Sequence, residues 1–123
     1  MNPYLFHILK ERKIVNPIND LKNRICRVYD ITLDDLKSDD VIRFNAEARH
    51  IFFFILKKTT PMTLSEIGLY LNRDHSSVIY GVKKVNNYLD ISYKSFEERL
   101  VKILTEDEIK VINDPRIYKL IKQ

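Results

Sequence analysis

The chain has 123 residues, of which 45% are hydrophobic, and its 21 Lys and Arg exceed its 17 Asp and Glu for a formal charge of +4. This length suits one domain, and the hydrophobic fraction excludes an intrinsically disordered chain. Two Gly and four Pro argue against a hairpin-rich β fold, and the longest apolar run, Ile51 to Leu56, is too short to span a membrane.

The distribution of Cys and His excludes several kinds of site. The single cysteine, Cys26, cannot form an internal disulfide, and no Cys/His set has the spacing of a zinc site. These features predict a reduced, cytoplasmic setting with no metal and no other cofactor. The three His are scattered and no carboxylate cluster adjoins a nucleophile, so we do not expect an enzyme.

Helix-start signals recur along the chain, and no segment alternates like a β-strand. Three Asx-Pro pairs each place a capping side chain before a proline at the first helical position: Asn2-Pro3, Asn16-Pro17 and Asp114-Pro115. Thr63 and Glu66 have the spacing of a capping box. The expected helices span 3–13, 17–29, 33–37, 42–58, 63–71, 75–90, 93–104 and 114–122. Helix 42–58 is apolar around most of its second half, so we expect it at the centre of an all-α fold.

Segment 63–90 has the layout of a helix-turn-helix, with a polar turn at 72–74 between two helices. At about 100° per residue, the second helix carries an apolar stripe on one side: Val78, Val82, Val85 and Leu89. Short polar and basic side chains occupy the opposite side: Ser76, Tyr80, Lys83, Lys84 and Asn87. Such a face suits a helix that enters the DNA major groove. The pattern alone is equally typical of an ordinary solvated surface helix.

The residues themselves show a more specific resemblance. Leu64-Ser65-Glu66-Ile67-Gly68, followed by Arg73-Asp74-His75-Ser76-Ser77-Val78-Ile79-Tyr80, resembles the signature of the DNA-binding C-terminal domain (domain IV) of the bacterial replication initiator DnaA. That signature is roughly L-x-E-I-G, a short turn, then R-D-H-T-T-V-x-H. The resemblance covers about 17–104 and implies a helix-turn-helix bundle of the Trp-repressor-like type. Segments 1–16 and 105–123 would then be N- and C-terminal helical extensions.

The resemblance also implies the DNA-contacting residues. The start of the second helix would contact bases, and Lys83 and Lys84 would contact phosphates. Simpler roles stay open for four residues: Asp74 as an N-cap only, His75 as a partly buried hydrogen-bonding histidine, Arg73 as a local partner of Asp74, and Arg49 as a surface cation. The expected DNA-binding set is Arg43, Arg49, Arg73, Asp74, His75, Ser76, Ser77, Tyr80, Lys83 and Lys84.

The sequence departs from the family at the loop before helix 42–58, which is normally strongly basic. With Arg49 aligned, Glu47 takes the position of an arginine that enters the minor groove in the family, and Arg43 is the nearby cation that could substitute. Segment 27–40 has a net charge of −3. Because each lost phosphate contact weakens binding, we expect weaker or altered DNA binding. The turn lacks the family's glycine, but Asn72 can adopt the left-handed conformation.

These features predict a sequence-preferring double-stranded DNA-binding protein of the replication-origin or regulatory type, with helix 75–90 in the major groove. DnaA initiators carry an ATPase domain with a phosphate-binding loop, and this chain has no such motif, so we expect no ATPase activity. A stand-alone module of this kind fits a mobile element, a phage or an accessory regulator. The alternative is a protein-interaction module that keeps the fold but binds a replication or regulatory protein, which the acidic 34–40 loop and Glu47 favour. We expect no membrane association, and either a monomer or a homodimer.

Overall fold

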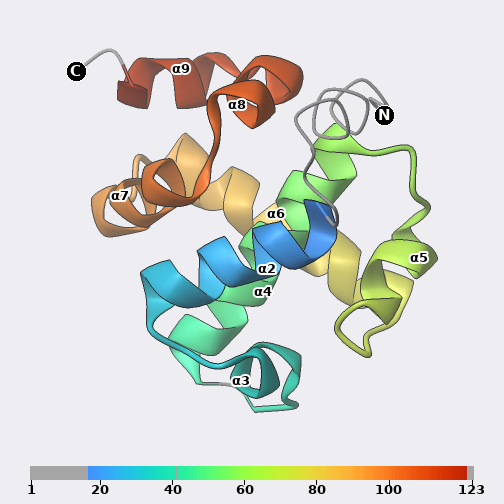
Figure 1. Ribbon diagram of the computed structural model, residues 1–123. Coiled ribbons are helices and arrows are strands. Elements are labelled where there is room, and N and C mark those ends of the chain that lie inside the picture. The colour runs from blue at the N-terminus through green and yellow to red at the C-terminus, as the bar shows by residue number, and fades with distance from the viewer. Residues whose placement is uncertain (1–16, 41, 122–123) are drawn as a thin grey trace.

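The computed structural model describes residues 17–40 and 42–121, and all of the regular secondary structure within them is helical (Figure 1). The expected all-α fold is therefore confirmed. The expected helix at 3–13, and with it the extension 1–16, lies outside the described residues. In chain order the helices are α2 (Pro17–Tyr29), α3 (Leu33–Lys37), α4 (Arg43–Thr59), α5 (Leu64–Leu69), α6 (His75–Asp90), α7 (Lys94–Ile103), α8 (Glu106–Ile112) and α9 (Pro115–Ile121).

Helix α4 is the centre of the bundle. Every side chain from Ile51 to Leu56 is at most 3% exposed, so this part of the helix is apolar on all sides. Helices α2, α3, α5, α6 and α8 all pack against it, and Figure 1 shows it passing through the middle of the molecule. Because a fully buried Phe or Ile contributes about 1.5 to 3 kcal/mol, this helix supplies much of the driving force for folding. The expected core role of the Phe run is confirmed.

Helices α5 and α6 form the expected helix-turn-helix. The Thr63 hydroxyl accepts from the backbone N–H of Glu66 at 3.1 Å, and Glu66 accepts from the N–H of Thr63 at 2.9 Å, which completes the predicted capping box. Asn72 has a φ of 56°, as predicted for the turn. The backbone N–H of Arg73 donates to the Gly68 carbonyl at 2.9 Å, so the chain has left the helix by then and α5 is shorter than expected.

Helix α8 is the one element of the described residues that the sequence did not predict. The Thr105 hydroxyl accepts from the N–H of Glu108 at 3.2 Å and Glu108 accepts from the N–H of Thr105 at 2.9 Å, so Thr105-x-x-Glu108 was the missed signal. Glu108 is also tied to Arg24 of α2 by a 2.7 Å ion pair. On α9, Ile117 is buried. Segment 105–121 therefore packs on the same core as the helix-turn-helix.

Candidate nucleic-acid interface

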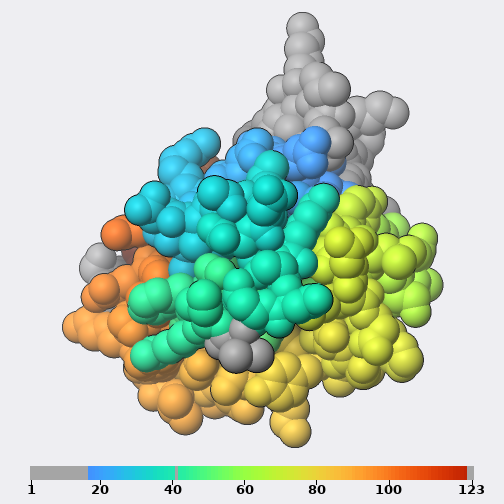
Figure 2. Space-filling view, turned by 90° about the horizontal axis from the view of Figure 1, so that it is seen from below, coloured from blue at the N-terminus to red at the C-terminus, as the bar shows by residue number. Residues whose placement is uncertain are grey.

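A groove of about 600 Å³ lies between the beginning of α6 and the beginning of α4 with the loop before it. Figure 2 looks onto this side, where the segment around α3 and the start of α4 borders the turn before α6. Three of the predicted residues do not line the groove, and all three are exposed on α6 or at its N-cap: Asp74, His75 and Lys83. The other seven line it: Arg43, Arg49, Arg73, Ser76, Ser77, Tyr80 and Lys84.

Asp74 organises the start of α6. Its Oδ1 accepts from the backbone N–H of Ser77 at 3.1 Å, from the Ser76 hydroxyl at 2.7 Å and from the Ser77 hydroxyl at 3.3 Å. The bond from the Ser76 hydroxyl, followed by that from the Ser77 N–H, lowers the pKa of Asp74 below its usual value. Asp74 is thus the N-cap, and it holds both hydroxyls at the exposed tip of the helix. Ser77 is half-buried, whereas His75 and Ser76 are exposed.

The sides of α6 follow the predicted angular pattern. Val78, Val85 and Leu89 are buried against the core. The opposite side is open and partly apolar, since Ile79 is 50% exposed and Tyr80 is 57% exposed. Further along this side Lys83 is exposed, and the Lys84 ammonium lies 5.2 Å from the centroid of the Tyr88 ring. A helix side with this exposure and charge is free to contact another molecule.

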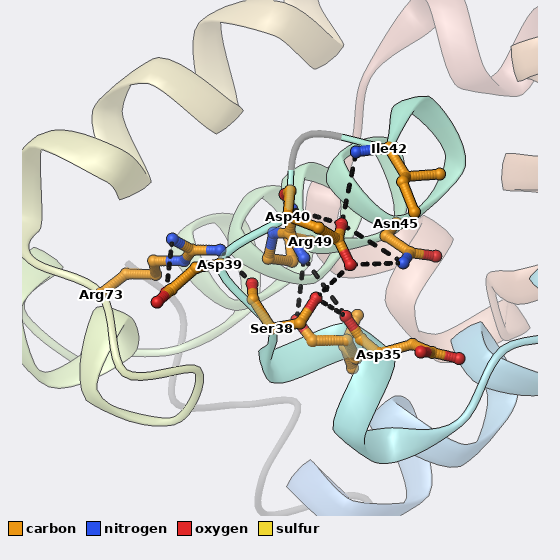
Figure 3. Close-up of polar contacts among 9 residues, drawn as sticks. Asp35, Ser38, Asp39, Asp40, Ile42, Asn45, Arg49 and Arg73 are labelled. Carbon is orange, nitrogen blue, oxygen red and sulfur yellow. Dashed lines mark hydrogen bonds and ion pairs between the residues drawn. The ribbon is translucent and has the colours of Figure 1, made fainter.

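Two of the predicted cations, Arg49 and Arg73, donate hydrogen bonds to the backbone before α4. The side chain of Arg49 is only 6% exposed, and it donates to the carbonyls of Asp35 and Leu36 at 3.3 Å and to that of Asp40 at 2.6 Å (Figure 3). Arg73 donates through Nη2 to the Ser38 carbonyl, and its Nη1 lies 3.6 Å from Asp39 Oδ1. Arg49 therefore supports the loop from beneath instead of projecting from the surface. The partner of Arg73 is Asp39, not the adjacent Asp74 considered from the sequence.

The carboxylates of this acidic loop have different roles. Asp35 accepts from the N–H of Thr32 at 3.0 Å and so caps α3. Asp40 accepts from the Ser38 hydroxyl at 2.5 Å and from the Asn45 amide at 3.1 Å, and the bond from Ser38 is the main reason that its pKa is lowered. Asp39, by contrast, has a side chain that is 98% exposed. Asp39 is the loop carboxylate that an approaching ligand would meet.

Glu47 is internal. It is 3% exposed, and its Oε2 accepts from the Tyr29 hydroxyl at 2.6 Å and from Arg99 Nε at 3.0 Å. Burial, and then the bond to Glu47, raises the pKa of Tyr29 above its usual value. The position that the resemblance aligns with a minor-groove arginine is thus part of an ion pair between α4 and α7 in which Glu47 is buried and the Arg99 side chain is 21% exposed. Arg43, the suggested substitute, is exposed, with its guanidinium 5.5 Å from the Tyr93 ring centroid.

His50 lines the groove and was missed from the sequence. Its ring meets Tyr80 edge-on with centroids 5.5 Å apart, and a Cβ on Gly81 would lie 3.1 Å from His50 Cδ2. Burial, followed by the nearby positive charges of Arg49, Lys84 and Arg73, lowers its pKa from 6.5 to about 4. The sequence signal for His50 is its position as a polar residue directly before the apolar run Ile51 to Leu56 on α4. His50 of α4 therefore packs against Tyr80 and Gly81 of α6 as a side chain that is uncharged at neutral pH.

Because His50 is uncharged in the folded state and titrates near 6.5 when unfolded, the unfolded chain binds more protons between those pKa values. Folding stability contributed by His50 is present above pH 6.5 and is lost as the pH falls toward 4. We expect the free energy of unfolding to fall by about 2 kcal/mol from pH 7 to pH 5 through this residue. Urea unfolding of wild type and His50→Gln at both pH values measures this fall in the free energy of unfolding. The fall should be much smaller in the variant than in wild type. An equal pH dependence of wild type and His50→Gln would contradict the assignment.

The described residues contain no group of three or more His, Cys, Asp or Glu that could hold a metal ion. Among the same residues, none of the helices has both the length and the apolar character needed to cross a bilayer.

Comparisons with known proteins agree with the helix-turn-helix geometry. The family model described as bacterial dnaA protein helix-turn-helix matches residues 18–85. The chain is similar to the chromosomal replication initiator protein DnaA of Rickettsia canadensis, Rickettsia massiliae and Rickettsia felis, with 30% identity to each over 100 residues. Each match covers 79% of this chain but 22% of the relative, so the chain spans about a fifth of the length of those initiators. The matched segment is more than half of the chain, and the described residues form an all-α bundle with a helix-turn-helix. The chain therefore belongs to the bacterial DnaA helix-turn-helix family, and this membership implies DNA binding.

Proposed function

We propose that this chain is a sequence-preferring duplex-DNA-binding protein of the replication-origin or regulatory type, that α6 enters the major groove, and that the chain itself has no ATPase activity. The observation that carries this proposal is the start of α6. There Asp74 orients the hydroxyls of Ser76 and Ser77, and His75 and Ser76 are exposed. Short, fixed polar groups at the exposed beginning of a helix are suited to approach base edges.

Each group at the start of α6 has a base partner that its chemistry favours. The bonds described for Asp74 end on Oδ1, and we expect Oδ2 to accept from a cytosine amino group. The Ser76 hydroxyl bonds to most bases. Ser76 and Ser77 lack the methyl group with which the family's threonines pack on a thymine methyl. The preferred site is therefore expected to differ from the family's at those positions.

Cations around the groove supply the contacts that do not depend on sequence. Lys83 and Lys84 lie more than two turns beyond the start of α6, and Arg43 is exposed at the edge of the groove. Such residues fix the orientation of a protein on the duplex through phosphates. Arg49 would act indirectly, because its bonds to three loop carbonyls hold the loop beside α6.

Fluorescence anisotropy with two labelled duplexes tests the proposal. One duplex carries the recognition box of the DnaA initiators and the other a scrambled version. We expect tighter binding to the box at low salt. Equal affinity for both would overturn a preference for a site that resembles the family's box, and no binding to either at low salt would overturn DNA binding.

Variants of α6 should separate the two kinds of contact. His75→Ala and Ser76→Ala are expected to reduce discrimination between box and scrambled duplex by about 1 to 3 kcal/mol, because they remove base contacts. Lys83→Gln and Lys84→Gln are expected to weaken binding to both duplexes alike and to flatten the slope of log K against log salt by about 0.9 each. Lys110→Gln, which removes an exposed cation from α8, is the matched control and should change neither quantity. A discrimination loss in the lysine variants would contradict these roles.

A protein-interaction module that binds a replication or regulatory protein is the second candidate. Two observations favour it: the guanidinium groups of Arg49 and Arg73 are engaged by the acidic loop, and Glu47 is committed to a buried ion pair. Failure to bind any duplex at low salt, by a chain that circular dichroism shows to be folded, would favour this candidate.

A further inference from the structure

Asp39 and Arg73 form a contact at the edge of the groove, next to the start of α6. Arg73 Nη1 lies 3.6 Å from Asp39 Oδ1, and Figure 3 shows the two side chains pointing toward each other. Both residues line the groove together with Ser76 and Ser77. The Arg73 side chain is 21% exposed, whereas that of Asp39 is 98% exposed. A solvent-exposed carboxylate therefore stands beside a guanidinium at the entrance to the proposed DNA face.

The contact is weak enough to be exchanged. An exposed ion pair at this separation contributes little to stability and is screened by salt. A DNA phosphate offers a guanidinium stronger, paired hydrogen bonds. The other acidic side chains near it are held differently, since Asp35 caps α3 and Asp40 is bonded to Ser38 and Asn45. Asp39 is thus the loop carboxylate that duplex binding would both displace from its partner and bring close to phosphate.

We propose that Asp39 is an affinity-determining residue that competes with a DNA phosphate for Arg73. In the free protein Arg73 is held by Asp39 and the Ser38 carbonyl; on a duplex its guanidinium turns to a phosphate while Asp39 is left facing the same backbone. The cost of this exchange lowers affinity for every duplex and most strongly at low salt. The inference rests on the proposed duplex binding and adds to it the residue that limits its strength.

Charge-neutralising variants of two exposed aspartates test the proposal by anisotropy. Asp39→Asn is expected to tighten duplex binding by about three- to tenfold near 50 mM salt, and the gain should shrink as salt screens the contact. Asp34→Asn changes the net charge by the same amount but removes an exposed carboxylate from α3 that does not line the groove. Its gain should be smaller by at least twofold. Equal gains for the two variants would overturn the proposal.

A double-mutant cycle tests whether the gain in duplex affinity from Asp39→Asn depends on Arg73. In an Arg73→Gln background, the gain from Asp39→Asn should fall by at least half, and an undiminished gain would overturn the competition. If Arg73→Gln does not fold, the comparison of Asp39→Asn with Asp34→Asn still decides the outcome. If neither wild type nor Asp39→Asn binds duplex at low salt, the proposed function fails; if both bind equally well, only this inference fails.

Discussion

Replacing Glu47 by alanine is expected to lower the free energy of unfolding by about 2 to 4 kcal/mol, because it leaves the remaining members of a buried polar cluster without their acceptor. Glu47 accepts from Tyr29 at 2.6 Å and forms a 2.9 Å ion pair with Arg99. Urea unfolding followed by circular dichroism measures the change. Glu98→Ala, which removes an exposed carboxylate from α7, should change stability by no more than about 0.5 kcal/mol. A loss below about 1 kcal/mol for Glu47→Ala would contradict the buried role.

The same cluster gives a structural reason for a carboxylate at position 47 of α4, where the resemblance aligns an arginine. An arginine at position 47 would lie against Arg99 and beneath Phe44, whose ring centroid is 5.0 Å from the Arg99 guanidinium. Two cations in so little solvent repel each other strongly. A carboxylate at position 47 therefore matches Arg99 on α7, and if the proposed function holds, phosphate contacts from this side of the groove would come from exposed residues such as Arg43.

Gly68→Ala is the second substitution with a large expected effect. Whether it lowers or raises the free energy of unfolding tests the close packing at the turn between α5 and α6. A Cβ on Gly68 would lie 2.4 Å from the carbonyl oxygen of Arg73 and 3.0 Å from that of Asp74. Both atoms are backbone, so the turn between α5 and α6 would have to move. We expect a loss of about 2 to 4 kcal/mol in the free energy of unfolding, although alanine is the better helix former by about 1 kcal/mol.

Thermal and urea unfolding check this prediction. Leu69→Ala, at the next position and 72% exposed, is the control and should have little effect. Because a shifted turn also displaces Asp74 at the start of α6, Gly68→Ala should weaken duplex binding under conditions where the variant remains folded. An unchanged or increased stability would show that the turn accommodates the methyl group, in contradiction to the close approach described here.

Local signals in the sequence predicted the described helices well, because caps and helical periodicity depend on neighbouring residues. The Thr63 capping box, the left-handed Asn72 and the apolar stripe of α6 are confirmed. Helix α8 was missed because seven residues give a weak periodic signal, although Thr105 and Glu108 have capping-box spacing. The short range of these signals is the reason that they identify elements better than the contacts between elements.

The environment of the charged side chains could not be predicted in this way. Nothing near Arg49 in the sequence shows that the loop folds back to offer it three carbonyls, and Arg99, the partner of Glu47, is 52 residues away. Such contacts arise only when distant helices pack together. For the same reason the sequence showed an acidic loop but not that Asp39 alone among its groove-lining carboxylates is fully exposed and paired with Arg73.

In vitro selection from a pool of random duplexes tests the central claim, sequence-preferring binding through the start of α6, most directly. Wild type and the double variant His75→Ala, Ser76→Ala would be carried through the same rounds at low salt. We expect wild type to enrich one recurring motif, and the variant to retain duplexes but to lose preference at some positions of that motif. Retention of duplexes by wild type with no motif enriched, or the same motif enriched equally by the double variant, would contradict the central claim.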